Sequence, residues 1–165
     1  MLRIPLARLA LPFLFASLSP FAAHTATAAP DTNVETAVTR QLERYEQALN
    51  ASDVDAVMKL YARDPVFMPQ HSLPAVGREA VRAAYRQVFA KIRLDIDFSI
   101  DEIRPLGPDW AFARTRSNGT VKVLGVDAPA GAEANQEVFL LHRENDGQWR
   151  FARYIFSTTN PPRQP

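Results

Sequence analysis

The sequence predicts an α+β domain in which helices come first and a run of antiparallel strands follows. Apolar residues recur at helical spacing between Val34 and Phe89, and from Ile92 onward the apolar period changes to two. The 165 residues, of which 47% are hydrophobic and 22% charged, suit one globular domain of ordinary core size. We see no internal repeat and no second domain.

The first 28 residues have the pattern of a secretory signal. A short basic head with Arg3 and Arg8 precedes an apolar run, and small residues follow up to Ala28. Two prolines break the run, which is shorter than the roughly 20 apolar residues of a membrane span. We predict a signal peptide over 1–28, a single domain over 29–165, and a periplasmic or secreted location. A retained membrane anchor is the alternative.

Three helices are predicted in the first half of the mature chain. The first ends at Asn50, the second begins after Asp53 and ends before Asp64, and the third opens at Gly77. Their apolar faces carry, in order, Val34, Val38, Leu42, Tyr45 and Leu49, then Val54, Val57, Met58 and Tyr61, then Val81, Tyr85, Val88 and Phe89. This spacing is typical of helices that cover one face of a sheet.

Strands are predicted in the second half. Apolar residues alternate with polar ones over 92–101, the clearest half-buried strand of the chain. Another strand covers about 110–123, and a brief one covers Val66–Met68 between the second and third helices. A long terminal hairpin extends from Gln136 to Pro162.

The turn of this hairpin predicts its register. Asn145, Asp146 and Gly147 tolerate the backbone angles of a tight loop, and we prefer a loop of these three residues. A loop of two residues would set Arg143 against Arg150, and like charges opposite each other repel. The preferred register pairs Leu141 with Phe151, Phe139 with Arg153, and Glu137 with Ile155.

Both faces of the predicted hairpin are largely apolar. One carries Glu137, Phe139, Leu141, Trp149, Phe151, Arg153 and Ile155, and the other carries Val138, Leu140, Ala152, Tyr154 and Phe156. Something should therefore cover each side. We expect the helices on the first face and a second copy of the chain on the other.

Composition excludes several classes of function. Nineteen basic and eighteen acidic residues are mixed along the chain, so neither a nucleic-acid site nor an anionic-membrane site is indicated. Without cysteine there is no disulfide framework, thiolate chemistry or thiolate-bound metal. The three histidines are dispersed and lack metal-ligand spacing, and no flavin or nicotinamide motif is present. We expect neither metal nor cofactor.

Four segments resemble the nuclear transport factor two-like superfamily, and within it the SnoaL-like and SgcJ/EcaC-like groups. They are Y-E-Q-A-L-N-A-S-D-V-D-A-V-M-K-L-Y-A at 45–62, D-P-V-F-M-P at 64–69, G-R-E-A-V-R-A-A-Y at 77–85 and D-G-Q-W-R-F-A-R-Y-I-F-S at 146–157. The resemblance implies a cone-shaped curved antiparallel sheet wrapped around three N-terminal helices. It also implies a blind apolar pocket for a small organic molecule, and a homodimer through the outer sheet face.

Enzymes of this superfamily, such as ketosteroid isomerase, scytalone dehydratase, limonene epoxide hydrolase and polyketide cyclases, place acids or bases in the pocket. Here no carboxylate lies between Pro65 and Arg78, where a base is expected, and Asp64 more plausibly ends a helix. Glu137 and Arg153, predicted on one face, either hold a substrate anion or tie to each other. His71, in a loop at the rim, is either a base or solvated.

The predicted pocket walls are mostly aromatic, although core packing also explains them. They are Tyr45, Tyr61, Met68, Tyr85, Trp110 and Phe139, with Arg114 and Arg153 as anion partners. Arg114 and Arg116 share a strand face with Trp110, where they form either an anion clamp or a solvated surface.

Three functions remain open at this point. The leading one is an exported domain that binds a small organic ligand in an apolar pocket. The second is a cofactor-independent enzyme using acid-base chemistry on a polyketide-, terpenoid- or steroid-like substrate, with Glu137, Arg153 and His71 as catalytic candidates. The third is a protein-interaction module that uses the outer sheet face.

Overall fold

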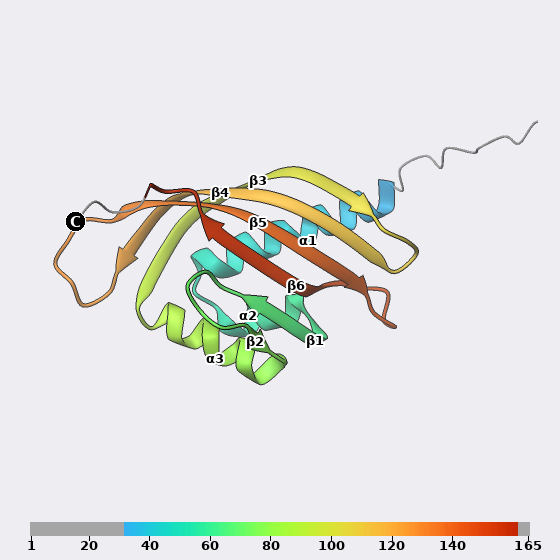
Figure 1. The fold of residues 1–165 in the computed structure, drawn as a ribbon, viewed down its shortest axis with the longest axis horizontal. Helices are drawn as coiled ribbons and strands as arrows, with labels where there is room; N and C mark the ends of the chain where they lie inside the picture. The colour runs from blue at the N-terminus through green and yellow to red at the C-terminus, as the bar shows by residue number, and fades with distance from the viewer. Residues whose placement is uncertain (1–31, 162–165) are drawn as a thin grey trace, which may run out of the picture.

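A computed structural model describes residues 32–161, so the predicted leader lies outside the described range and its cleavage stays a prediction. The elements are α1 (Thr32–Asn50), α2 (Val54–Leu60), β1 (Tyr61–Met68), β2 (Ala75–Val76), α3 (Arg78–Phe89), β3 (Ile92–Pro105), β4 (Trp110–Val123), β5 (Gly131–Arg143) and β6 (Trp149–Thr158). Figure 1 shows the long strands β3, β4 and β5 arching over the three helices. Of the helices in this range, none has the length and apolar character to cross a bilayer.

The sheet is mixed and curved, and it does not close. Its strand order is β2-β1-β6-β5-β4-β3, so β2 and β3 form the two edges. The α+β class and the wrapping around three helices are confirmed, but the sheet is not wholly antiparallel, because β1 runs parallel to β6. A parallel pair requires a long crossover, and everything between β1 and β6 supplies it.

The second helix ends earlier than predicted. Asp53 caps α2 through its Oδ1, which accepts a hydrogen bond from Ala56 N at 2.9 Å. After Leu60 the chain turns directly into β1, so Tyr61 and Asp64 belong to a strand and not to a helix. The buried Pro65 follows, in the irregular stretch of β1–β6 pairing where a missing N–H is tolerated.

Polar side chains attach α1 to the edge strand β3. The Asn50 side chain donates to Ile96 O at 2.8 Å and accepts from Ile96 N at 3.0 Å. One turn earlier, Glu46 Oε2 accepts a hydrogen bond from Phe98 N at 2.7 Å. These contacts satisfy backbone groups of β3 that have no strand beside them.

The predicted three-residue turn of the terminal hairpin is confirmed. Glu144 N donates to Gln148 O at 3.0 Å, Gly147 N donates to Glu144 O at 2.8 Å, and Gly147 has φ 76. Leu141 faces Phe151, as the turn chemistry predicts. The register of the first half of the hairpin therefore follows from the sequence.

The second half of the hairpin does not keep this register, because a β-bulge follows Phe151. The pairing shifts between Leu141 and Leu140, so Ala152 is an extra residue on β6 and Leu140 faces Arg153. Beyond the bulge, Phe139 faces Tyr154 and not Arg153. Since a slip of one residue exchanges the two faces of a strand, Tyr154 turns inward and Arg153 outward.

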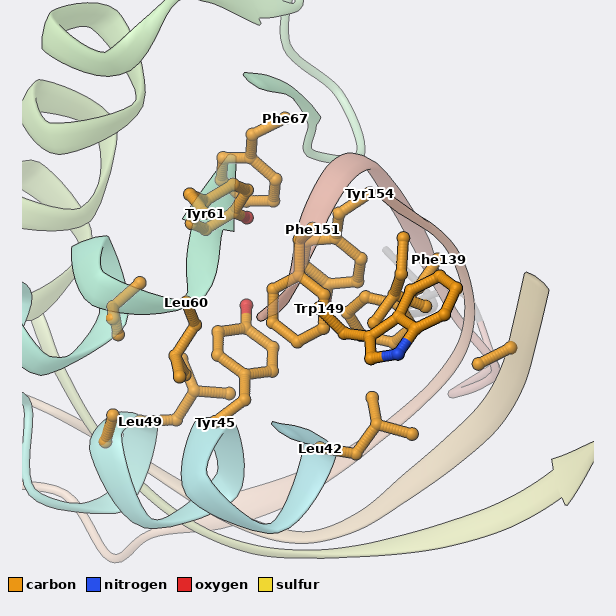
Figure 2. Close-up of a cluster of buried hydrophobic side chains, with 14 of the residues drawn as sticks. Leu42, Tyr45, Leu49, Leu60, Tyr61, Phe67, Phe139, Trp149, Phe151 and Tyr154 are labelled. Atoms are coloured by element: carbon orange, nitrogen blue, oxygen red, sulfur yellow. The ribbon is translucent and has the colours of Figure 1, made fainter. Parts of the chain in front are cut away.

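The core is organised around the ring of Tyr45, which is 1% exposed. Its centroid lies 5.2–5.9 Å from those of four other rings, which belong to Phe98, Phe139, Phe151 and Tyr154. Figure 2 shows Tyr45 rising from α1 toward the rings of β1 and β6. Edge-to-face packing of this kind adds stability beyond buried area alone.

We predict that Gly119→Ala destabilises the fold, because β3 and β4 approach closely there. A Cβ at residue 119 would lie 2.1 Å from Asp95 O and 2.7 Å from Ile96 Cα. Overpacking of this kind costs about 1–3 kcal/mol in the free energy of unfolding, measurable by urea denaturation. Gly131→Ala is the matched control, since its Cβ would meet nothing within 4 Å. Equal stability of the two variants would contradict the close approach.

Candidate functional site

A polar cluster interrupts the inner face of the sheet, which we define as the face packed on the helices. Glu137 of β5 is 3% exposed and faces Thr115 of β4. Thr115 Oγ1 donates a hydrogen bond to Glu137 Oε2, and Ser117 Oγ donates to Oε1 at 3.0 Å. The Tyr154 hydroxyl of β6 lies 3.5 Å from the same Oε1. Three strands therefore contribute to the surroundings of one buried carboxyl.

Asn135 extends this cluster toward the far end of β5. Its Nδ2 donates to Ser117 Oγ at 3.3 Å and to Glu133 Oε1 at 2.8 Å. Its Oδ1 is buried and has no hydrogen-bond partner within residues 32–161. A buried acceptor without a donor costs free energy, so a donor group brought to this oxygen would stabilise the site.

Burial raises the pKa of the Glu137 carboxyl above its ordinary value. The hydrogen bonds from Thr115 and Ser117 favour the charged form and lower the pKa, but burial outweighs them. Burial also raises the pKa of the Tyr154 hydroxyl, and the nearby Glu137 raises it further. Tyr154 therefore keeps its proton, and Glu137 holds its proton to higher pH than an exposed glutamate does.

A chain of tyrosine hydroxyls crosses the interior beside this cluster. Tyr45 and Tyr85 lie 2.5 Å apart through their hydroxyl oxygens, and Tyr61 and Tyr85 lie 2.8 Å apart. Burial raises the pKa of all three hydroxyls well above the ordinary value. The chain joins α1, β1 and α3, so each buried hydroxyl finds its partner in another helix or strand.

Aromatic rings fill the interior next to Glu137. Phe139, Tyr154, Phe67 and Tyr85 form a stack with successive centroid distances of 4.3, 5.3 and 5.0 Å and interplanar angles of 7°, 7° and 14°. The resemblance implies a blind apolar pocket at this place. In this structure the interior is apolar, but the stacked rings occupy it.

Four of the predicted wall residues lie together in this interior. They are Tyr45, Tyr61, Tyr85 and Phe139, all at most 2% exposed. The other four, Met68, Trp110, Arg114 and Arg153, lie on the outer face of the sheet, where Trp110 is 42% exposed. The sequence thus predicts the aromatic interior correctly, but assigns to it several residues that point away from it.

The arginines of β4 show why some predicted wall residues point away from the interior. Ala111, Ala113, Thr115 and Ser117 are buried and alternate with exposed residues along β4, so Arg114 and Arg116 point outward. Both bind Asp101, with nitrogen–oxygen distances of 2.7 Å from Arg114 and 2.8 Å from Arg116, and Arg116 lowers the pKa of this carboxyl. Neither arginine therefore faces the interior, and an anion clamp on the outer face stays a prediction.

The predicted pairing of Glu137 with Arg153 is also wrong. The bulge at Ala152 turns Arg153 to the outer face, where its Nη1 donates to Asp64 O at 2.9 Å. His71, the third catalytic candidate, lies exposed in the loop between β1 and β2 with φ 58. Of the three candidates, Glu137 alone lies on the inner face.

Sequence reasoning missed the side chains that surround Glu137, namely Thr115, Ser117, Asn135 and Tyr154. A signal for two of them existed, because small residues alternate from Ala111 to Ser117 and mark an inner face. Which residues of β5 face Thr115 and Ser117 depends on the β4–β5 register, and the sequence of the loop between these strands does not determine that register. The inward orientation of Tyr154 depends on the bulge after Phe151.

Two surface hollows lie outside the stack of rings. One of about 480 Å³ lies between α1, α2 and the start of β6 and includes no residue of the polar cluster. One of about 290 Å³ lies over β4, β5 and β6, and its lining includes Thr115, Glu137 and Phe156 beside outer-face residues such as Ile155. Within residues 32–161, no group of three or more histidine or carboxylate side chains is arranged to hold a metal ion.

The arched sheet over three helices places the protein in the nuclear transport factor two-like superfamily. The chain belongs to the SnoaL-like domain family, whose pattern matches residues 42–152. The SgcJ/EcaC subgroup stays a prediction. No curated protein shows significant similarity to the chain.

Solved structures agree with this membership. A ketosteroid isomerase-like protein from Erwinia carotovora atroseptica SCRI1043 is 31% identical, with a TM-score of 0.73 over 76% of this chain and 96% of that one. A candidate scytalone dehydratase from Novosphingobium aromaticivorans DSM 12444 is 22% identical, with a TM-score of 0.70 over 79% and 88%. A protein of unknown function from Pseudomonas putida KT2440 is 18% identical, with a TM-score of 0.63 over 78% and 89%. The last two show the fold alone.

We predict that Glu137→Gln changes how stability depends on pH. Because the folded-state pKa of Glu137 is raised, its stabilising contribution is complete below the unfolded-state value and is lost as pH rises through the folded-state value. The wild type should therefore lose stability relative to Glu137→Gln as pH rises from about 4 toward neutrality. Urea denaturation across this range measures the difference.

A second variant checks the cause of the effect. Thr115→Val removes a hydrogen bond that lowers the pKa of Glu137, so the loss of stability should extend to higher pH and become larger. A difference between wild type and Glu137→Gln that does not vary with pH would contradict the raised pKa.

Proposed function

We propose that this protein binds a small organic molecule with its inner sheet face, and that Glu137 holds the one polar group of an otherwise apolar, planar ligand. The observation that carries the proposal is the buried carboxyl among hydroxyl groups from two neighbouring strands. The surrounding rings of Phe139, Tyr154 and Phe67 favour a flat ligand.

The fold itself has no need of a carboxyl at this position. A buried carboxyl with a raised pKa costs stability when it ionises, and an apolar residue of similar size avoids that cost. Such costs concentrate at functional sites. The unpaired Asn135 Oδ1 supports the same conclusion, because it offers an acceptor to a ligand that donates a hydrogen bond.

Because rings fill the interior, ligand entry requires some of them to move. Phe98 and Phe156 are half-buried, whereas Phe139 and Phe151 are fully buried. In the sheet, Phe98 faces Ser117 and Phe156 faces Glu137, so both lie beside the polar cluster. These two rings are the ones we expect to be displaced.

Thermal unfolding in the presence of naphthol tests this proposal. A ligand that binds only the folded state raises the melting temperature by mass action. We expect Glu137→Gln to keep the shift, because an amide still makes hydrogen bonds, and Glu137→Leu to abolish it. Glu43→Leu, on the exposed face of α1, is the matched control. A shift of equal size in Glu137→Leu, or none in the wild type at millimolar ligand, would reject the proposal.

A cofactor-independent enzyme is the second candidate. The raised pKa of Glu137, next to the Tyr154 hydroxyl, suits a group that moves a proton. The similarity to a ketosteroid isomerase-like protein adds support. The assay is conversion of a β,γ-unsaturated ketosteroid to the conjugated enone, followed by absorption. If the protein is such an enzyme, Glu137→Gln should still bind the steroid but lose turnover. Absence of turnover by the wild type would contradict the isomerase proposal and would not affect the binding proposal.

We also propose that the chain forms a homodimer through the outer sheet face. The bulge removes Tyr154 and Phe156 from the surface predicted to meet the partner, but it leaves Val138 and adds Ile155. A largely apolar patch results, in which Arg153 lies between Val66 and Leu140; its apolar members, across four strands, are Val66, Met68, Phe112, Val138, Leu140 and Ile155. Patches of this kind often mark protein interfaces.

Sedimentation at micromolar concentration tests the dimer. Ile155 lies at the centre of the patch and is 45% exposed. A charged side chain at this position would be buried without a partner in the interface, so Ile155→Glu should sediment as a monomer. Val126→Glu, in the β4–β5 loop and 52% exposed, should leave the dimer intact. A monomeric wild type would refute this arrangement.

A further inference from the structure

One surface hollow includes no residue of the polar cluster in its lining. It has a volume of about 480 Å³ and runs between the C-terminal half of α1, the α1–α2 turn, α2 and the start of β6. Pockets for small molecules commonly have volumes of several hundred cubic ångströms. We call this hollow the helix groove. Its lining includes Arg44, Ala48, Lys59, Leu60 and Trp149.

Apart from Gln41, the buried part of the groove lining is apolar. Ala48, Leu60 and Trp149 are 4%, 6% and 7% exposed, so they form its floor. Figure 2 shows Leu60 and Trp149 on either side of the Tyr45 ring. A flat apolar molecule placed on this floor would extend the core by one layer.

Two cations of the groove form no direct ion pair or hydrogen bond in the described part of the chain. Arg44 of α1 and Lys59 of α2 are exposed, and neither forms an ion pair or a hydrogen bond there. Arg150 is different, because Asp146 binds both of its terminal nitrogens at 2.7 Å. Arg44 therefore carries free positive charge, whereas Lys59 has unused hydrogen-bond donors but helps to lower the pKa of the nearby Asp55.

The lining contains a single acid, Asp53, which already serves the backbone. Its Oδ1 accepts a hydrogen bond from Ala56 N, and this contact caps α2. Gln41 is 6% exposed and is held by a hydrogen bond from its Nε2 to Leu60 O at 3.0 Å. The groove thus combines a largely apolar floor with two cations that have unused hydrogen-bond donors in the described part of the chain.

We propose that the helix groove binds an organic anion, namely an aromatic carboxylate whose ring lies on Ala48, Leu60 and Trp149. Its carboxylate would lie between Arg44 and Lys59, which supply hydrogen-bond donors that the protein leaves unused. This site is independent of the interior around Glu137. An enzyme or binding domain with both sites would hold two different small molecules.

Naphthoate is the probe, with naphthylmethanol as its neutral counterpart. Binding is followed in the full chain by the emission of Trp149, with Trp110→Phe removing the only other tryptophan. We expect the double variant Arg44→Gln/Lys59→Gln to weaken naphthoate binding about tenfold, as loss of a charged contact on a partly exposed surface implies. Added salt should weaken binding to the wild type, because it screens the two charges.

Arg86→Gln/Lys91→Gln is the matched control. It removes the same charge from exposed positions on and just after α3 and should leave naphthoate affinity unchanged. Unchanged affinity in Arg44→Gln/Lys59→Gln, equal affinity for naphthylmethanol, or no binding by the wild type would each overturn the proposal. Loss of naphthoate binding in Glu137→Leu, with no effect of the groove variant, would place the ligand in the interior instead.

Discussion

The β-bulge at Ala152 determines which side chains of the last strand face the helices. Before it, the Asn145–Gly147 turn sets the register of the hairpin, and Phe151 points inward. After it, one extra residue exchanges the faces, so Tyr154 reaches Glu137 and Arg153 does not. With a regular hairpin, a guanidinium would enter the aromatic core, and the stack of rings between β5 and α3 would lose its central member. The place of Tyr154 in the polar cluster and that of Ile155 in the apolar outer patch both depend on this single insertion.

Glu137 is tolerated in the core because polar groups and aromatic rings share the space around it. Hydroxyls of Thr115 and Ser117 lie against its two oxygens, which reduces the cost of burial without removing it, as the raised pKa indicates. In the tyrosine chain the hydroxyls pair with one another instead, and Tyr85, the middle member, hydrogen-bonds to both Tyr45 and Tyr61. The interior is therefore a mixed surface, with an apolar body and a few fixed polar groups. Ligand-binding sites commonly have this composition.

Much of the fold follows from local sequence patterns. Helical spacing places Tyr45 and Tyr85 in the core, and the Asn-Asp-Gly turn places Leu141 against Phe151. What local patterns do not contain is the relation between distant strands. The parallel pairing of β1 with β6, and the pairing of Thr115 with Glu137, depend on how segments that are distant in the sequence meet in the fold. The bulge is harder still, because Phe151 and Ala152 are both apolar and both buried, so alternation of residue types does not reveal which one is extra.

The closed interior bears on whether this protein is a binder or an enzyme. Chemistry on a substrate requires the carboxyl to meet the reacting atoms, and here Phe139, Tyr154 and Phe67 lie in ring contact beside it. A ligand must replace some of these ring contacts with its own, so the net gain in apolar burial on binding is small. Affinity would then depend on the polar group that meets Glu137 and Asn135. Discrimination by hydrogen bonding is much stronger than discrimination by a methylene group in an apolar pocket. A filled aromatic interior with one carboxyl therefore favours selectivity for the polar group of the ligand over selectivity for its apolar body.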